Sequence, residues 1–274
     1  MRAFMYFKVG SIHNEGEIDA EEAKFIEDIT VGPIIRVSEK KNRIINTSEF
    51  HSIDINSSYP SIYMSDFPIP MSKGIIYDEL PERLIGKEEQ ISSYTHPETE
   101  KVIVYEKTIP MSLLFKKMTI ALYNLKLQGN SLAKLCLNCL WGLMCAFNIR
   151  TEDLTQDILD NKRESIQRIH RDGEKVDMLY KDHYFKSNYA RMKPFFLRRG
   201  RKNLNELINI IDSYPDTKPE IVRCHTDSVL TNCDVNYPPL KARISDKIGD
   251  YKIETKLEPN TNYMIMNKLF MKKV

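Results

Sequence analysis

The chain has 274 residues, of which 42% are hydrophobic, and a formal net charge of +2. This length suits one large domain or two small ones with a core, and no apolar run is long enough to span a membrane. The start, MRAFMYFKVGS, is too short and too interrupted by lysine for a signal peptide. The five cysteines are odd in number and lack the regular spacing of a disulfide framework. They therefore indicate free thiols in a reducing, cytoplasmic compartment.

The small net charge hides a strong segregation of charged residues. Seven acids and one lysine lie between Glu15 and Asp28, whereas 107–151 and 186–205 contain basic residues and no acid. A run of charged residues in a sequence most often forms a solvent-exposed surface. Two long acid-free basic stretches in a nearly neutral chain nevertheless favour a polyphosphate or nucleic-acid partner.

The first part of the chain predicts short strands and loops. We expect a strand at 33–37 and another at 53–55 that ends in Asn56-Ser57-Ser58. Pro68 and Pro70 are expected to break any regular element. The segment 71–110 has the pattern of a loop-rich or hairpin insertion.

The second part predicts helices and then strands again. Apolar residues recur at steps of three and four over 113–147, which predicts two helices split at Gly129-Asn130, with Asn130 or Ser131 as the cap. Strands are expected over 163–185, a helix over 195–211, and a hairpin over 220–232. Strands and helices do not alternate as in repeated βαβ units, so this order predicts an α+β fold around an antiparallel sheet.

The stretch SIDINSSYPSI, which begins at Ser52, combines a carboxylate with small polar residues. Asp54 ends an apolar strand, so its carboxylate would lie at a sheet edge beside backbone N–H groups of a turn. A carboxylate can hold a hard cation, and exposed N–H groups can hold phosphate oxygens. The alternative, a capping aspartate at a strand end, is the more common fate of a single Asp.

The stretch KLCLNCLWG places Lys134, Asn138 and Trp141 on one helix face. These three side chains suit a nucleotide: the cation can bind a phosphate, the amide can hydrogen-bond the sugar or the base edge, and the flat aromatic ring can stack on the base. The alternative is a solvent-facing polar stripe with Trp141 in the core. Cys136 and Cys139 also form a CxxC pair, but we expect both to pack on the apolar stripe and to bind no zinc.

The stretch RCHTDSVL places Asp227 between two hydroxyl residues at a tight turn. Together, the three stretches resemble the polymerase core of family B DNA polymerases, with the closest likeness to the protein-primed group of phages, adenoviruses and linear plasmids. That family carries D-x-x-S-L-Y-P-S, then K-x-x-x-N-S-x-Y-G, then Y-x-D-T-D-S. The segment IGDYKIE at 248–254 resembles the family's L-G-x-x-K-x-E.

The resemblance implies a palm with an antiparallel sheet and helical fingers. It assigns 1–50 to a lead-in segment, 51–112 to the first part of the palm, 113–150 to the fingers, and 151–274 to the second part with the catalytic hairpin. The implied activity is DNA-directed DNA synthesis. A nucleotide would pass from a dNTP to a primer 3′-hydroxyl or a protein-primer hydroxyl, with two Mg²⁺ ions that Mn²⁺ can replace.

The resemblance also implies a role for each matching residue. Asp54 and Asp227 would be the catalytic, metal-bridging carboxylates, with the Ile55 carbonyl as a backbone ligand. The nucleotide-binding residues would be Ser57, Ser58, Tyr59, Lys126, Lys134, Asn138 and Trp141. The primer–template DNA would lie against Arg198, Arg199, Arg201, Lys202 and Tyr263.

The third motif departs from the family at His225, which stands where the family has its first Asp. Mg²⁺ prefers oxygen ligands, and a neutral imidazole adds no negative charge, so His225 weakens the expected metal site. The roles of His225 and of Thr226 beside it stay open. The family's K-x-Y becomes Thr261-Asn262-Tyr263, without its lysine.

Parts of the family's architecture are expected to be missing. Only 53 residues precede Asp54, too few for an editing exonuclease, and the thumb is expected to be absent or minimal. The expected partners are primer–template DNA, dNTPs, a terminal-protein primer, and separately encoded exonuclease or thumb subunits, with no membrane. One alternative is a weak or inactive nucleic-acid-binding subunit of a split or viral replication complex. Another is a primase or terminal-protein nucleotidyltransferase with the same site.

Overall fold

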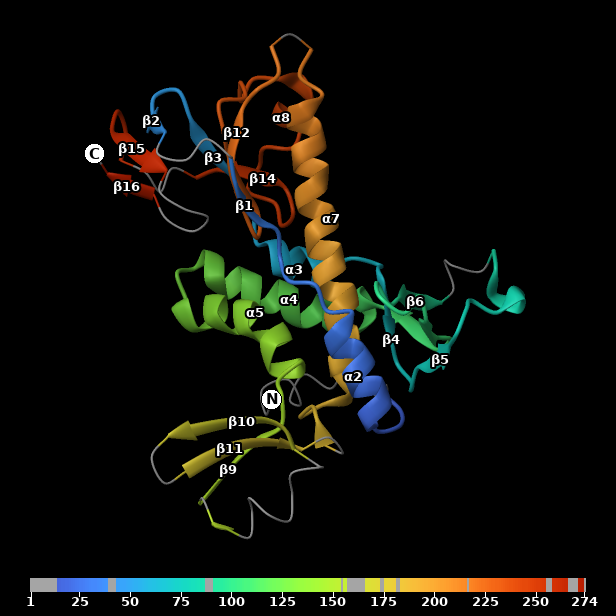
Figure 1. Ribbon diagram of the computed structural model, residues 1–274. Coiled ribbons are helices and arrows are strands. Elements are labelled where there is room, and N and C mark those ends of the chain that lie inside the picture. The colour runs from blue at the N-terminus through green and yellow to red at the C-terminus, as the bar shows by residue number, and fades with distance from the viewer. Residues whose placement is uncertain are drawn as a thin grey trace. The chain divides into compact units, whose positions relative to one another are not determined.

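The computed structural model describes residues 14–38, 43–86, 91–153, 155–156, 166–172, 175–180, 183–215, 217–254, 258–265 and 271–273. Within these residues the protein has a mixed α+β fold with antiparallel sheets, which confirms the predicted fold class (Figure 1). The chain folds as two compact units, Met1–Val31 with Tyr63–Phe195 and Gly32–Ile62 with Phe196–Val274. None of the described helices is both long and apolar enough to cross a membrane.

The second unit is built on a five-stranded sheet with the strand order β1-β12-β13-β3-β14. The strands are β1 (Ile35–Val37), β3 (His51–Ile55), β12 (Ile221–His225), β13 (Ser228–Thr231) and β14 (Tyr251–Ile253). Strand β3 pairs with β13 on one side and with β14 on the other. The predicted strand at 53–55 and the predicted hairpin at 220–232 are therefore neighbours in one sheet.

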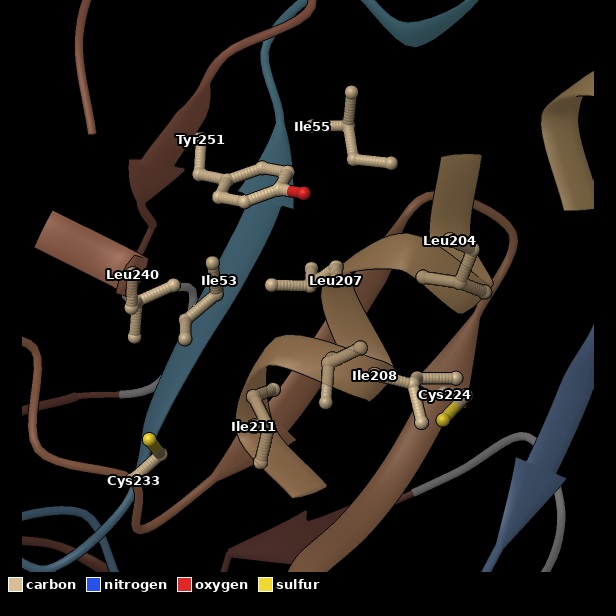
Figure 2. Close-up of a cluster of buried hydrophobic side chains, with 11 residues drawn as sticks. Ile53, Ile55, Leu204, Leu207, Ile208, Ile211, Cys224, Cys233, Leu240 and Tyr251 are labelled. Atoms are coloured by element: carbon tan, nitrogen blue, oxygen red, sulfur yellow. The ribbon is translucent and has the colours of Figure 1, made fainter. Parts of the chain in front are cut away.

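Helix α7 (Lys193–Asp212) packs its apolar residues against one face of this sheet. Figure 2 shows this core, in which helix and sheet residues interdigitate: Ile53, Ile55, Leu204, Leu207, Ile208, Ile211, Cys224 and Tyr251. Val229 belongs to the same cluster. Successive side chains of a strand point to opposite faces. Because Ile53 and Ile55 face α7, Asp54 projects from the opposite face.

The rest of the second unit surrounds this sheet. Helix α3 (Ser58–Tyr63) follows β3 after a short turn, and α8 (Pro238–Lys241) precedes β14. A smaller sheet has the order β16-β15-β2, with β2 (Ile44–Asn46), β15 (Asn262–Ile265) and β16 (Met271–Lys273). A second apolar cluster packs between the small sheet and the large one: Ile45, Phe50, Val222, Leu230 and Tyr263.

Within the described residues, the first unit combines several helices with three small antiparallel sheets. Its α-helices include α2 (Ala20–Asp28), α4 (Met111–Leu127) and α5 (Ser131–Met144), and its short 3-10 helices include η1 (Glu82–Leu84) and η4 (Asn188–Met192). The sheets are β4-β8, β5-β7-β6 and β10-β11-β9. Their strands are β4 (Pro68–Pro70), β5 (Ile75–Tyr77), β6 (Ser92–Thr95), β7 (Val102–Tyr105), β8 (Thr108–Pro110), β9 (Ile149–Asp153), β10 (Ile166–Asp172) and β11 (Lys175–Tyr180).

Two local predictions have opposite outcomes. The split of the helical region is confirmed, because α4 ends before Gly129 and the Asn130 side chain accepts a hydrogen bond from Ala133 N at 3.0 Å. The prediction that Pro68 and Pro70 break regular structure is wrong, because they form strand β4. Strand β4 pairs with β8 in a two-stranded sheet, where a residue without an N–H can face away from its partner.

A buried ion pair joins Arg191 of η4 to Glu22 of α2 in the first unit. The two side chains are 0% and 1% exposed, and Arg191 Nε donates to Glu22 Oε1 at 2.7 Å. Arg191 Nη2 donates to Glu22 Oε2 at 2.9 Å. The guanidinium also donates to the Asn14 side chain and to the carbonyls of Glu15, Gly16 and Glu17. Part of the acidic segment therefore faces inward rather than solvent.

Candidate active site

Four polar side chains lie in one row across the five-stranded sheet. The strand register pairs His225 with Ser228, Ser228 with Asp54, and Asp54 with Lys252. Residues that pair directly across antiparallel strands project to the same face of the sheet. The row therefore lies on the face opposite to α7, and it unites residues from three distant parts of the sequence.

The backbones at Asp54 and Asp227 lie close together because β3 pairs with β13 of the β12–β13 hairpin. The N–H of Ile55 donates to the carbonyl of Asp227 at 2.9 Å, which holds the hairpin tip beside the end of β3. Asp54 is buried, with 9% of the residue exposed. Burial raises the pKa of the Tyr59 hydroxyl, and the negative charge of Asp227 adds to this shift. Asp227 therefore lies close enough to Tyr59 for its charge to affect the ionisation of the Tyr59 hydroxyl.

The hairpin turn contains backbone strain. Thr226 has a φ of 58°, in the left-handed region that β-branched residues rarely adopt. Such a conformation costs about 1–3 kcal/mol and clusters at functional sites. The N–H of Thr226 donates to the Ile34 carbonyl at 2.9 Å, and the N–H of Asp227 donates to the His225 carbonyl at 2.7 Å. The first bond ties the turn to the residue before β1 and the second closes the turn itself, so the two bonds restrain the backbone position of Asp227.

The turn after β3 is fastened to the segment before β14. The Asn56 side chain donates to the carbonyls of Asp246 and Lys247, and its backbone N–H donates to the Asp250 carbonyl at 2.7 Å. The N–H of Gly249 donates to the Asn56 carbonyl at 2.8 Å. Gly249 has a φ of 86°, and a Cβ there would lie 3.0 Å from the Cβ of Ser61. These bonds fix where β14 begins.

Lys252 is a site residue that our sequence reasoning missed. Its Nζ lies 3.1 Å from Asp54 Oδ2 and 3.4 Å from Glu254 Oε1. Burial by itself would lower the pKa of Lys252, but the charge of Asp54 and then that of Glu254 outweigh it and raise this pKa. The signal in the sequence is the K-x-E of IGDYKIE, in the segment that resembles the family's L-G-x-x-K-x-E.

The residues predicted to bind the nucleotide lie at two places. Ser57, Ser58 and Tyr59 follow β3 directly, and the Tyr59 ring packs 5.4 Å from the ring of Phe196. The remaining four belong to the first unit, and their approach to Asp54 stays a prediction. Of these, Lys134 and Asn138 are exposed on α5, Trp141 is half-buried, and Lys126 lies on α4: its Nζ is 5.1 Å from the Tyr123 ring.

The residues predicted to contact DNA differ in their surroundings. Arg198 and Lys202 are exposed on α7, whereas Arg199 and Arg201 are half-buried. Arg201 donates to the Gly32 carbonyl at 3.2 Å. Tyr263 packs in the apolar cluster beside the small sheet, and its hydroxyl accepts a hydrogen bond from Glu258 N. Contact between these residues and DNA stays a prediction.

The oxygen atoms near the ends of β3 and of the β12–β13 hairpin are of the type that binds a hard cation, although they do not by themselves form a complete metal site. Among the described residues, no group of three or more His, Cys, Asp or Glu side chains is arranged to hold a metal ion. Asp54 and Asp227 supply two carboxylates. Mg²⁺ accepts such oxygen ligands and commonly completes its shell with water and substrate phosphates. The residues present therefore fit Mg²⁺ shared with a nucleotide.

The expectation that Cys136 and Cys139 pack in the core is wrong, because both are exposed. The buried stripe of α5 is formed instead by Ala133, Leu137, Leu140 and Met144. Helix α5 packs mainly on α4, and one neighbouring helix covers only a narrow stripe. The stripe of apolar residues along α5 is therefore wider than the part of the helix surface that is buried.

We expect a thiol reagent at pH 8 to label Cys136 and Cys139 quickly in the folded protein. The buried Cys145, Cys224 and Cys233 should react only after unfolding. Burial raises the pKa of Cys145 to about 12, so its reactive thiolate is scarce at this pH. Peptide mass spectrometry after a short pulse of reagent checks the result. Fast labelling of a buried cysteine would contradict the packing described above.

Comparison with solved structures relates this fold to Phi29 DNA polymerase. Its complex with single-stranded DNA matches with a TM-score of 0.62 and 14% sequence identity, over 96% of this chain and 53% of that chain. Its complex with primer–template DNA matches with a TM-score of 0.62 and 14% identity, over 96% of this chain and 51% of that chain. Its complex with primer–template DNA and incoming nucleotides matches with a TM-score of 0.61 and 14% identity, over 96% and 52%.

These matches show a shared fold. The chain spans about half the length of the solved polymerase chains. No family model matches the sequence, and no curated protein matches it.

Proposed function

We propose that the chain is the catalytic core of a DNA-directed DNA polymerase of the protein-primed family B type. The five-stranded sheet would be the palm, and α4 and α5 would be the fingers. The observation that carries the proposal is the pairing of β3 with the β12–β13 hairpin, which brings Asp54 and Asp227 together in a fold shared with a DNA polymerase.

Nucleotidyl transfer depends on positioning and charge neutralisation more than on covalent chemistry. Asp54 and Asp227 would hold Mg²⁺, or Mn²⁺ in its place, with the Ile55 carbonyl as a backbone ligand. Bound Mg²⁺ supplies positive charge at the attacking 3′-oxygen and the leaving pyrophosphate. A tyrosine hydroxyl is protonated at neutral pH, and the raised pKa of Tyr59 keeps it so at higher pH, so this hydroxyl can donate a hydrogen bond to the nucleotide.

The basic and polar residues outside the sheet would bind the substrates. Ser57, Ser58, Lys126 and Lys134 would contact the triphosphate, Asn138 would order the site, and Trp141 would face the nascent base pair. The basic residues of α7 would hold the primer–template backbone without sequence preference. The partners would be DNA, dNTPs, a terminal-protein primer and separately encoded exonuclease or thumb subunits of a viral replication complex.

Primer extension tests this function. A labelled primer–template is incubated with the protein, dNTPs and Mg²⁺ or Mn²⁺, and DNA binding is measured in parallel by fluorescence anisotropy at several salt concentrations. Extension by the wild type supports the proposal. Salt-sensitive DNA binding without extension in either metal would contradict it, and would favour the non-catalytic nucleic-acid-binding subunit.

His225→Asp is expected to strengthen binding of the divalent cation about fivefold. The substitution adds a negative charge to the row that contains Asp54, and charges this close at a protein surface interact by about 1 kcal/mol or more. The measurement is the Mg²⁺ concentration that gives half-maximal extension. His225→Asn is the control, because it removes the imidazole without adding charge. Equal effects of Asp and Asn would rule out charge as the cause.

A further inference from the structure

Lys252, a member of the polar row, has no part in the proposed chemistry. Lys252 Nζ lies 3.1 Å from Asp54 Oδ2, and the two side chains are 38% and 12% exposed. Because the carboxylate is mostly withdrawn from water, this pair is screened less than an ion pair between two exposed residues. Asp54 therefore already has a cation beside it before any metal ion arrives.

The backbone places Lys252 at this position. Lys252 and Asp54 are directly paired in the register of β14 and β3. The hydrogen bonds between Asn56, Gly249 and Asp250 fix that register, and a slip of one residue would turn Lys252 to the α7 face. The contact thus follows from the strand pairing rather than from one choice of rotamer.

Lys252 also has a second carboxylate within reach. Glu254 Oε1 lies 3.4 Å from the same Nζ, two residues further along the chain. Glu254 directly follows β14, and its N–H donates to the Ser52 carbonyl of β3 at 2.8 Å, so the extended pairing continues and side chains at i and i+2 lie on one face. A lysine ammonium is a point charge on a flexible stem. The ammonium can therefore move toward Glu254 without losing an ionic partner.

We propose that Lys252 is a built-in counter-ion of Asp54, which competes with a divalent cation for this carboxylate and moves to Glu254 when the cation binds. This inference rests on the proposed function, in which Asp54 is a metal ligand. The ammonium offsets the charge of Asp54 and orients it in the metal-free protein. The same ammonium lowers the affinity of the site for Mg²⁺ and Mn²⁺.

The test is Mn²⁺ binding, measured by the EPR signal of free Mn²⁺ without DNA or nucleotide. Lys252→Met should lower the Mn²⁺ dissociation constant at least fivefold, because the competing charge is gone. Glu254→Gln should raise it severalfold, because Lys252 loses its second partner. Lys247→Met is the matched control: it removes an exposed lysine of the same segment and should change the constant little.

An Asp54→Asn background shows whether the effect belongs to this site. The gain from Lys252→Met should disappear there, as coupling in a double-mutant cycle requires. The inference is overturned if Lys252→Met binds Mn²⁺ as weakly as the wild type or more weakly, or if its gain persists without Asp54. Lys252→Gln, which keeps a polar tip, replaces Lys252→Met if circular dichroism shows that the latter is misfolded.

Primer extension is read separately from Mn²⁺ binding, so the two failures are distinguishable. If the wild type extends no primer and Lys252→Met still binds Mn²⁺ more tightly through Asp54, the proposed function fails and the counter-ion role stands. If the wild type extends primers and Lys252→Met brings no gain in affinity, the function stands and the counter-ion role fails.

Discussion

Asp54→Asn and Asp227→Asn are each expected to slow primer extension about 10³-fold or more while the protein stays folded. Each change replaces a carboxylate by an amide of nearly the same shape, so it removes the charge of one proposed metal ligand without opening a cavity. Charge stabilisation by bound metal contributes several kcal/mol to such a transition state, and about 4 kcal/mol corresponds to about 10³ in rate. Single-turnover extension with a labelled primer measures the loss.

Asp78→Asn is the matched control for this result. Asp78 has a side chain that is 90% exposed and pairs with Lys101 in the first unit, so extension should be unchanged. The double variant at Asp54 and Asp227 should lose little more than either single variant, because residues that act as one unit are not additive. If either single variant extends the primer at a tenth of the wild-type rate or faster, the assignment of Asp54 and Asp227 as catalytic carboxylates is wrong.

Arg191→Met is expected to destabilise the first unit by about 3–5 kcal/mol. The change leaves the Glu22 carboxylate buried without its partner, and breaking a buried pair from one side costs about this much. The carbonyls of Glu15, Gly16 and Glu17 lose a donor at the same time. Urea unfolding followed by circular dichroism gives the change in the free energy of unfolding.

Two further variants separate charge burial from general disruption. Arg83→Met removes an arginine whose side chain is 56% exposed in its pair with Glu106, and it should have little effect. Arg191→Met combined with Glu22→Leu should recover part of the loss, because no unpaired charge remains buried. A loss below 1 kcal/mol in Arg191→Met alone would show that the pair does not hold this unit together.

Local patterns in the sequence predicted the local structure well. The Gly129-Asn130 break and its cap could be found because helix ends depend on adjacent residues. The hairpin around Asp227 could be found because strand ends and turn residues follow one another along the chain. The order of three short motifs then pointed to the polymerase fold that the solved structures share.

Features that depend on distant partners could not be predicted from the sequence. The contact of Lys252 with Asp54 depends on the register between β14 and β3, which no local pattern specifies. Arg191 stands in the basic stretch 186–205, which favours a polyphosphate or nucleic-acid partner, yet it is buried in an ion pair with Glu22, 169 residues away. Cys136 and Cys139 match an apolar pattern, but exposure depends on which neighbours cover a helix face.

The alternation of the two units along the chain has a consequence for synthesis on the ribosome. Strand β3 emerges early, but its partners β13 and β14 follow only after the whole of the segment from Tyr63 to Phe195. At about 5–20 residues per second, that delay is on the order of ten seconds. Until then β3 offers two unpaired edges, which are templates for wrong pairing. We therefore expect the first unit to fold first, and the sheet that carries Asp54 to be the last part completed and the one most in need of chaperones.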